Sequence, residues 1–365
     1  MESLLPLLIL QNIPNLGDGS IKKLIQQVGS AEGVLKEKKS NLLKIEGIGM
    51  RKIENLHNPI HLRNAEKELK FIENEKLQIT AYDQQDYPKR LKECIDAPVI
   101  LFSSGNTKWN NKQPIISIVG TRKITSYGQR FCEKLIQDLK YFDPIIVSGF
   151  AYGVDITAHN CAVKEGLQTI ACVAHGLNQI YPKSHKKYMR AVEENGGFVT
   201  EFWSTSELSP KNFLSRNRII AGMSEATIVI ESGERGGSLV TAEIANSYYR
   251  DVFAVPGRTN DVYSKGCNML IKSQQAHMLN GIEDLVYILN WNKKKEQKNI
   301  QKQLFIDLTP KEQIIFDYLQ TNGKSNLDDL SITTKIPTYQ LAGMLIALEL
   351  KGVVSPLPGK VFELV

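Results

Sequence analysis

The chain has 365 residues, of which 42% are hydrophobic and 23% are charged, and such a composition excludes a wholly disordered protein. Its length predicts two or three domains, because a single hydrophobic core rarely grows to this size. The 45 Lys and Arg residues exceed the 39 Asp and Glu residues and give a net charge of +6. This charge permits a nucleic-acid partner without requiring one.

The cysteines and the apolar runs indicate the compartment. The five cysteines lie far apart and form no C-x-x-C pair, which is typical of reduced thiols in a cytoplasmic protein. The apolar run at residues 4–10 lacks the basic start and the cleavage site of a signal peptide. No apolar stretch approaches the ~20 residues that a membrane-spanning helix needs. We therefore expect a cytoplasmic protein without a membrane partner.

Residues 1–78 are expected to form a small helical domain, since glycines interrupt short helical patterns up to about residue 75. Two segments, residues 13–19 and 45–49, resemble the hairpin of a helix-hairpin-helix, in which a glycine turn offers backbone N–H groups to a DNA phosphate. Glycine is also the usual helix terminator, so such hairpins can serve packing alone. Both interpretations stay open.

Residues 79–290 alternate short β-branched runs with helical patterns. Each run is almost continuously apolar, which is typical of a parallel sheet that is buried on both faces. We therefore predict an α/β fold with an extended, doubly wound, Rossmann-like parallel sheet. The expected strands are residues 115–119, 145–147, 169–173, 198–200, 226–230 and 252–255.

The C-terminal part is predicted to be a separate domain. Residues 291–304 are polar and charged without an apolar period, and are expected to be a linker. Residues 305–365 predict a winged-helix-like domain, in which Thr309 and Glu312 form a capping box at the start of the first helix. The expected third helix, residues 338–351, carries one basic residue near its end. This favours protein contact over the reading of a DNA groove.

Glycine-containing turns follow three of the expected strands. In such sheets ligands bind at the carboxyl ends of the strands, where helix N-termini offer unpaired N–H groups to anions. Arg122 would add a charged fork for a phosphate. Thr125 or Ser126 is expected to cap the helix after the first turn, and Asp155 the helix after the second. The turns are Gly120-Thr121-Arg122, Ser148-Gly149 and Gly236-Gly237-Ser238.

The segment between the fourth and fifth expected strands combines an aromatic residue with cations. The Phe213 ring could stack on a base while guanidinium groups meet phosphates. The same residues could also be only the start of a surface helix. Lys183, in a basic turn after the third strand, is a further candidate that could be merely solvated. The polar and charged candidates beside Phe213 are Lys211, Arg216, Asn217 and Arg218.

Familiar catalytic and metal-binding motifs are absent from the sequence. The nearest match to a P-loop, at Gly323, has Tyr318 in the first glycine position. The chain has no G-x-G-x-x-G after the first strand, no H-E-x-x-H, no close Cys/His cluster and no G-x-S-x-G. His159 and His175 are interpreted as structural histidines. We therefore predict no catalytic residue, no metal ligand and no cofactor.

The motifs named above are part of a longer ordered series between about residues 85 and 285. In chain order they are residues 117–122, 147–149, 153–155, 180–182, 216–222, 237–242, 252–257 and 266–271. In this order they resemble the DNA-processing protein A (DprA/Smf) family. The helical N-terminus and the winged-helix-like C-terminus also resemble the domain order of many members.

The resemblance implies a single-stranded DNA-binding recombination mediator that protects DNA taken up in natural transformation and loads a RecA-type recombinase onto it. It also implies a homodimer with no established catalytic activity. Two departures from the family pattern change the charge and shape expected of the rim, namely Tyr152 in place of the usual Arg and Ala174-His175-Gly176 in place of a more glycine-rich turn. By motif match the DNA-binding residues would be Gly120, Thr121, Arg122, Ser126, Ser148, Gly149, Lys183, Lys211, Phe213, Arg216, Asn217, Arg218, Gly237 and Ser238.

Two other functions use the same rim. Arg235-Gly236-Gly237-Ser238, followed by Thr241 and Glu243, is similar to the loop of lysine-decarboxylase-like nucleotide phosphoribohydrolases. The protein would then be an enzyme that releases a base from a nucleoside monophosphate. A Rossmann-like rim could also sense a nucleotide second messenger, which predicts saturable binding of a mononucleotide.

Overall fold

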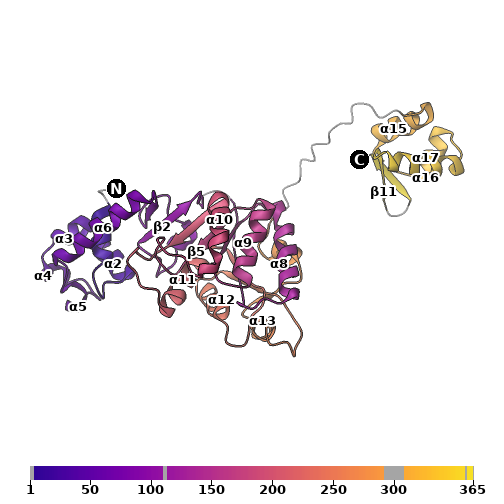
Figure 1. Ribbon diagram of the computed structural model, residues 1–365. Helices are drawn as coiled ribbons and strands as arrows, with labels where there is room; N and C mark the ends of the chain where they lie inside the picture. Colours follow the sequence, from indigo (N-terminus) through magenta and orange to yellow (C-terminus); the bar gives the residue numbers. More distant parts are fainter. Residues whose placement is uncertain (1–3, 110–112, 292–307, 358–359, 365) are drawn as a thin grey trace. The chain divides into compact units, whose positions relative to one another are not determined.

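The structure, a computed structural model, describes residues 4–109, 113–291, 308–357 and 360–364. The chain divides into two compact units, Met1–Lys294 and Lys295–Val365 (Figure 1). Each has a hydrophobic core of its own. Of the predicted linker, residues 291–304, only Trp291 lies within the described residues. The two units are therefore treated separately.

The centre of the larger unit is a sheet of nine strands within the described residues, in the order β1-β2-β6-β5-β4-β3-β7-β8-β9. The strands from β6 to β9 run parallel, and β2 and β1 extend the sheet as antiparallel strands at one edge. The predicted Rossmann-like parallel sheet is confirmed. The strands are β1 (Gln78–Ala81), β2 (Ile100–Gly105), β3 (Ile115–Val119), β4 (Ile145–Ser148), β5 (Thr169–Cys172), β6 (Gly196–Thr200), β7 (Ala226–Val229), β8 (Asp251–Ala254) and β9 (His277–Met278).

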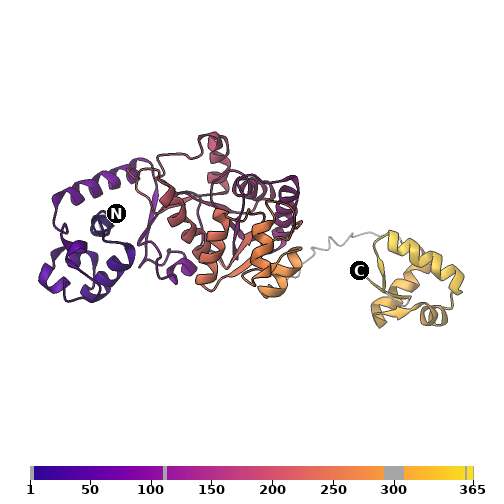
Figure 2. The same ribbon diagram turned by 90° about the horizontal axis from the view of Figure 1, so that it is seen from below.

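Helices cover both faces of this sheet (Figures 1 and 2). Ile116 and Ile118 of β3 pack into the core beneath one layer of helices, whereas Ile115 and Val119 pack into the core of the other layer. Burial on both faces explains why β3 is apolar throughout. One layer holds α8 (Ser126–Leu139), α9 (Val154–Glu165), α10 (Met189–Asn195) and α14 (Ile282–Ile288), and the other holds α7 (Lys89–Lys92), α11 (Pro210–Met223), α12 (Gly237–Ser247) and α13 (Lys265–Lys272).

The N-terminal helices pack on the antiparallel edge of the sheet. Their apolar side chains share a hydrophobic cluster with Phe102 of β2 and with Trp203, which follows β6. The indole Nε1 of Trp203 also donates a hydrogen bond to Gln11 Oε1 at 2.7 Å. The helical part is thus fixed to the core. It consists of α1 (Leu5–Gln11), α2 (Asp18–Val28), α3 (Ala31–Lys36), α4 (Lys39–Leu42), α5 (Met50–Ile53) and α6 (Pro59–Asn74).

The C-terminal unit has a winged-helix fold, as predicted. The capping box is present, because Thr309 Oγ1 accepts from the Glu312 backbone N and Glu312 Oε2 accepts from the Thr309 backbone N. The turn expected at residues 358–359 lies outside the described residues. The elements are α15 (Pro310–Asn322), α16 (Leu327–Thr334), α17 (Thr338–Leu350) and an antiparallel sheet of β10 (Ser325–Asn326), β12 (Val361–Leu364) and β11 (Val354–Leu357).

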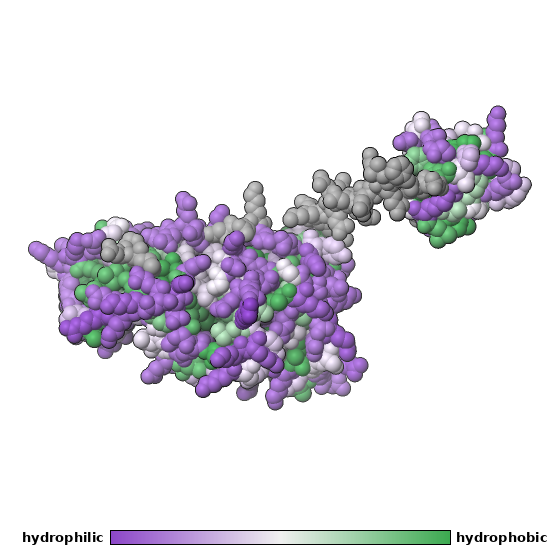
Figure 3. All heavy atoms as spheres, turned by 45° about the horizontal axis from the view of Figure 1, so that its top comes forward, coloured by the Kyte–Doolittle hydropathy of each residue, from purple (hydrophilic) through white to green (hydrophobic). Residues whose placement is uncertain are grey.

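Hydrophilic side chains cover much of the larger unit in Figure 3, and apolar side chains also reach the surface of the C-terminal unit. Among these residues, no helix combines the length and the apolar character needed to cross a membrane.

Candidate nucleic-acid interface

A cavity of about 360 Å³ opens at the carboxyl ends of β3 and β7. The two strands are neighbours in the sheet. The helices that follow β3, β4 and β5 cover one face, and those on either side of β7 in the chain cover the other. The winding therefore reverses between β3 and β7, and open α/β sheets bind ligands at such a switch point.

The turn after β3 is held rigidly at this point. The Thr121 backbone N donates to Glu231 O at 2.7 Å, and Thr121 O accepts from the Val154 backbone N at 3.1 Å. Gly120 has no room for a side chain, because a Cβ would lie 2.4 Å from Val154 Cγ2. A Cβ on Gly153, whose φ is +75°, would lie 2.2 Å from Thr121 O. These contacts fix the turn between the end of β7 and the start of α9, with Arg122 at its tip.

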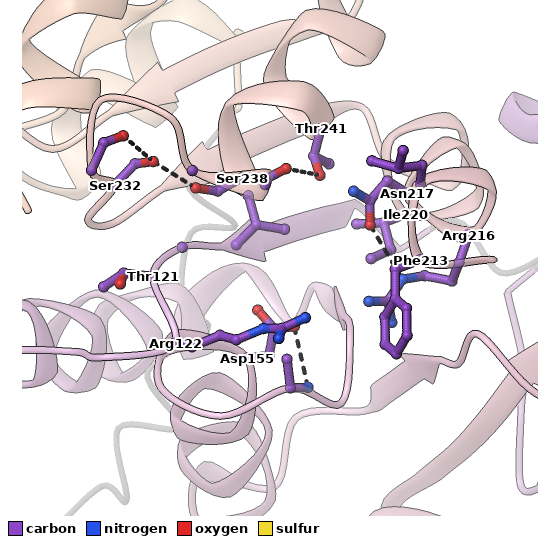
Figure 4. Close-up of a pocket in the computed structure, with 17 residues that line it drawn as sticks. Thr121, Arg122, Asp155, Phe213, Arg216, Asn217, Ile220, Ser232, Ser238 and Thr241 are labelled. Atoms are coloured by element: carbon purple, nitrogen blue, oxygen red, sulfur yellow. Dashed lines mark hydrogen bonds between the residues drawn. The ribbon is translucent and has the colours of Figure 1, made fainter. Parts of the chain in front are cut away.

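Arg122 lies at the mouth of the cavity beside an aromatic ring. Its exposed side chain places the guanidinium carbon 5.7 Å from the centre of the Phe213 ring. Tyr181 meets the same ring edge to face, with 5.6 Å between the ring centres. Figure 4 shows Arg122 extending toward Phe213, which stands at the start of α11. A planar cation and an aromatic ring are thus presented together to solvent.

Beneath Phe213, Arg216 belongs to a buried charged cluster. Its side chain is 5% exposed and donates to Cys172 O, while Nε donates to Asn217 Oδ1 at 3.3 Å. Asp155 faces it, since a Cβ built on Gly149 would lie 2.3 Å from Asp155 Oδ2 and 2.8 Å from Arg216 Nη1. Burial raises the pKa of Asp155 and lowers the pKa of Arg216, and each charge partly opposes the shift of the other. Gly149 therefore makes room for this pair.

The opposite wall of the cavity carries hydrogen-bond donors. Ser238 Oγ donates to Ser232 Oγ at 2.9 Å, and Thr241 lies one turn further along α12. Gly236 is the N-cap of α12 and provides no side-chain cap, and the Leu239 backbone N donates to Gly236 O at 3.0 Å. The N–H groups of Gly237 and Ser238, the first two of this helix, are offered to a ligand. These groups and Arg122 flank the cavity from two sides (Figure 4). The cavity therefore suits an anion.

The structure brings some of the predicted site residues together at this cavity and separates others from it. The side chain of Ser148 is buried and donates to Ile118 O at 2.6 Å. Gly149 lies against the buried pair of Asp155 and Arg216. The predicted residues that line the cavity are Gly120, Thr121, Arg122, Phe213, Arg216, Asn217, Gly237 and Ser238. The predicted residues that do not line it are Ser126, Ser148, Gly149, Lys183, Lys211 and Arg218.

The two predicted helix caps differ in their outcome. Thr125, not Ser126, caps α8 and accepts from the Gly128 backbone N at 3.2 Å. The expectation that Asp155 caps α9 is wrong, because Gly153 is the N-cap residue. The Asp155 carboxylate instead accepts from the Ala151 backbone N at 3.4 Å and closes the loop that precedes the helix.

Three predicted cations lie away from the cavity. Lys183 starts the short 3-10 helix Lys183–Tyr188 and Lys211 lies in the first turn of α11, and both are exposed. Arg218 is part of an ion-pair network, because its Nη2 lies 3.2 Å from Asp18 Oδ2 and also contacts the Glu201 carboxylate. Arg218 therefore connects α2 to the core and does not face the cavity.

The two departures from the family pattern lie in a smaller neighbouring hollow of about 40 Å³. Tyr152 is exposed and shares a 2.7 Å hydrogen bond with Ser184, whereas His175 is buried and contacts Gly176 O through Nδ1. Tyr181 joins them in this hollow, and sequence reasoning assigned it no role. The sequence signal that could have identified Tyr181 was its place directly after Ile180, in a loop that follows a strand.

The His, Cys, Asp and Glu residues of the described parts are candidates for chemistry at the site. No group of three or more His, Cys, Asp or Glu among them is arranged to hold a metal ion. Burial lowers the pKa of His159 to about 4, and the ring contacts Thr169 and Gly149 O, as suits a structural histidine. Glu243 is exposed on α12 and does not line the cavity, unlike Thr241.

The doubly wound sheet with a cavity at its switch point and the winged-helix unit define a class of Rossmann-like α/β proteins with a C-terminal winged helix. Residues 78–290 match the family described as DNA recombination-mediator protein A, and residues 303–360 match the DprA winged helix domain. The first match covers more than half of the chain. The chain therefore belongs to the DNA recombination-mediator protein A (DprA) family.

Individual relatives agree with this assignment. Protein Smf from Synechocystis is 33% identical over 265 residues, which are 71% of this chain and 66% of that protein. DNA processing protein DprA from Streptococcus pneumoniae is 40% identical over 186 residues, which are 51% of this chain and 65% of that protein. The chain thus spans just under two thirds of the length of these two relatives.

Solved structures show the same fold. The crystal structure of DNA processing protein A from Streptococcus pneumoniae has a TM-score of 0.64 at 31% identity, and the match covers 78% of this chain and 97% of that one. A structure of DNA processing protein A from Helicobacter pylori, which concerns its single-stranded DNA binding mode, has a TM-score of 0.53 at 29% identity. That match covers 59% of this chain and 97% of the other.

Proposed function

We propose that this protein is a recombination mediator that binds single-stranded DNA at the cavity between β3 and β7. The observation that carries the proposal is the exposed guanidinium of Arg122, 5.7 Å from the centre of the Phe213 ring, opposite the donors at the start of α12. The single-stranded DNA binding of the Helicobacter pylori relative supports it.

In this proposal some residues of the site contact the DNA bases and others contact the DNA backbone. The Phe213 ring provides a surface on which a base can stack, and stacking tolerates every base because each has a π-face. Arg122 and the first N–H groups of α12 would hold phosphates, which carry no sequence information. In a duplex the bases are already stacked on one another. The site therefore favours single strands of any sequence.

The proposal extends to the biological role that the family assignment suggests. The protein would protect DNA taken up in natural transformation and load a RecA-type recombinase onto it, acting as a cytoplasmic homodimer without catalytic residues. For the winged-helix unit we propose a protein partner. Three exposed apolar side chains of α17, Tyr339, Ile346 and Leu350, support this role, because a DNA-reading helix would instead present cations and polar groups.

The test is a comparison of single-stranded with duplex DNA in a filter-binding assay. Wild-type protein is expected to prefer the single strand, and its affinity should fall steeply with salt. Arg122→Ala should weaken binding about tenfold or more, because a hydrogen bond to a charged group contributes about 1.5–3 kcal/mol. Lys134→Ala, which removes an exposed cation in the second half of α8, serves as the matched control. Equal binding by all three proteins would refute the proposal.

Competition in the same binding assay and a separate activity assay distinguish the two alternative functions. Competition by a mononucleotide at concentrations near those of the DNA would favour a nucleotide sensor. Release of free base from a nucleoside monophosphate, lost in Glu243→Gln, would favour a phosphoribohydrolase. Glu243 is exposed and does not line the cavity, which argues against a phosphoribohydrolase.

A further inference from the structure

We propose that the N-terminal helices extend the path of the single strand, and that a groove between α2 and α11 holds phosphates beyond the switch-point cavity. This inference rests on the proposed function, since it assigns a second segment of the same ligand. The groove has a volume of about 730 Å³ and is lined from both sides, among others by Ser20, Lys23, Lys52 and Ser215. It is twice as large as the first cavity.

The groove and the cavity adjoin one another along α11. Leu214 lines both of them and is 54% exposed. Phe213 lies before it at the cavity, and Ser215 and Arg218 follow it at the groove. A strand that stacks one base on Phe213 can therefore pass over Leu214 and continue between α11 and α2. The apolar Leu214 side chain offers a contact for a base at that crossing.

The carboxylates that line the groove have partners other than its lysines, so the lysines can bind phosphates. The Asp18 carboxylate accepts from the Val99 backbone N at 3.0 Å and from Arg218 at 3.2 Å, and Asp96 accepts from the Tyr248 hydroxyl. By contrast, the half-exposed Lys23 lies 3.8 Å from a Glu46 carboxylate that is 97% exposed. A pair this loose and this solvated contributes little.

Lys52, in α5, lines the groove and donates to the backbone at Gly47 O at 2.8 Å. Its charge is therefore not neutralised by that contact. Together Lys23 and Lys52 place two cations along the groove on the side that faces α11. Neutralising phosphates with lysines is the main source of affinity that does not depend on sequence.

The start of α2 is open toward a ligand. A Cβ built on Gly17 or Gly19 would meet no atom within 4 Å, and neither residue has a positive φ. Packing and backbone conformation therefore do not require glycine at either position. Glycine at the N-cap position of Gly17 is common, but at Gly19, inside α2, it weakens the helix. Its presence leaves the backbone of the first turn uncovered where it lines the groove.

The groove is formed before any ligand binds. The Ser204 backbone N and Oγ donate to the two oxygens of Glu68 at 2.8 and 2.6 Å, and Arg218 bridges Asp18 and Glu201. These contacts join the N-terminal helices to the core, and Asp18 and Arg218 both line the groove. Binding therefore needs little ordering of the protein, which favours affinity.

The experiment measures affinity for oligothymidylates of about 4 and about 16 nucleotides, the range of single-strand site sizes of small binding modules. The proteins are the full-length wild type, Lys23→Glu, Gly19→Glu and the control Lys134→Glu. Gly19→Glu introduces a side chain for which α2 has room, and it adds a negative charge to the groove. Circular dichroism melts verify that all four proteins fold.

We expect wild type to bind the long oligonucleotide more tightly than the short one. Lys23→Glu and Gly19→Glu should lose about tenfold on the long oligonucleotide and less than about twofold on the short one, because only the long one reaches the groove. In Lys23→Glu the salt dependence on the long oligonucleotide should weaken by about 0.7 in log–log slope, the value for one phosphate contact in a single strand. Lys134→Glu should bind as wild type.

The outcomes distinguish this inference from the proposed function. If Arg122→Ala weakens both oligonucleotides while Lys23→Glu and Gly19→Glu bind both as wild type does, the groove is not on the path and the proposed function stands. If wild type binds neither oligonucleotide, both proposals fall. Equal losses on the long and the short oligonucleotide in the groove variants would also overturn the extension, since they would indicate damage to the first cavity.

Discussion

The guanidinium carbon of Arg122 lies 5.7 Å from the centre of the Phe213 ring, and that of Arg216 lies 6.0 Å from the same ring centre. The two cations differ in exposure. Arg122 is exposed, whereas Arg216 is buried and donates to Cys172 O. A buried cation thus helps to position the ring, and an exposed one stands beside it at the solvent. Their roles can be tested separately.

Removal of the ring should weaken DNA binding without loss of fold. Stacking of one base on an aromatic side chain contributes about 1–3 kcal/mol, so Phe213→Ala should bind oligothymidylate about tenfold or more weakly in a fluorescence anisotropy titration. Phe213→Tyr keeps the ring and should bind nearly as wild type. Tight binding by Phe213→Ala would show that the base does not stack there.

Replacement of Arg122 by Lys separates charge from shape. Lys keeps the positive charge but lacks the planar fork that can hold a phosphate with two bonds and lie against a ring. We expect Arg122→Lys to keep the salt dependence of wild type and to lose about 1 kcal/mol or more of affinity, an amount typical of one net hydrogen bond. Arg122→Ala should in addition lower the slope of the salt dependence by about 0.7. Identical slopes for Lys and Ala would argue against a phosphate contact.

A methyl group at Gly149 should disturb the buried pair that supports the site. Its Cβ would lie 2.3 Å from Asp155 Oδ2 and 2.8 Å from Arg216 Nη1, and overpacking of this kind costs about 1–3 kcal/mol. Gly149→Ala should therefore melt several degrees below wild type and bind single strands more weakly. Gly237→Ala is the stability control, because a Cβ there would meet no atom within 4 Å. Equal melting temperatures for the two variants would contradict this role of Gly149.

Sequence periodicity predicted those parts of the fold that depend on local pattern. Burial on both faces makes β3 apolar throughout, so its bounds and its place in a parallel sheet could be read directly from the sequence. The capping box at Thr309 is equally local. The order of the strands and the switch point between β3 and β7 depend on long-range pairing, and the sequence alone does not determine them.

The candidate site was predictable at the level of loops but not of individual side chains. Arg216 and Arg218 are two residues apart on α11, and positions two apart on a helix point in nearly opposite directions. Hence Arg216 lies at the cavity while Arg218 pairs with Asp18 and Glu201. The position of Ser148 at the end of a strand predicts a place on the rim, yet its side chain points into the sheet and donates to Ile118 O.

The network around Arg218 makes a prediction about pH. One guanidinium faces two carboxylates, those of Asp18 and Glu201. Burial, with a smaller contribution from the charge of Asp18, raises the pKa of Glu201 to about 7 from its usual 4.5. Because the pKa is higher in the folded state than in the unfolded chain, the folded protein binds this proton more tightly.

The stabilisation is therefore complete below about pH 4.5 and is lost as the pH rises through about 7. Between about pH 5 and about pH 8 it should fall by about 2 kcal/mol, visible as a lower melting temperature at the higher pH. Glu201→Gln should flatten this part of the profile, since glutamine stays neutral and can still accept from Arg218. Glu243→Gln, a change at an exposed position of α12, should leave the profile unchanged. A Glu201→Gln profile as steep as that of wild type would mean that another group binds the proton.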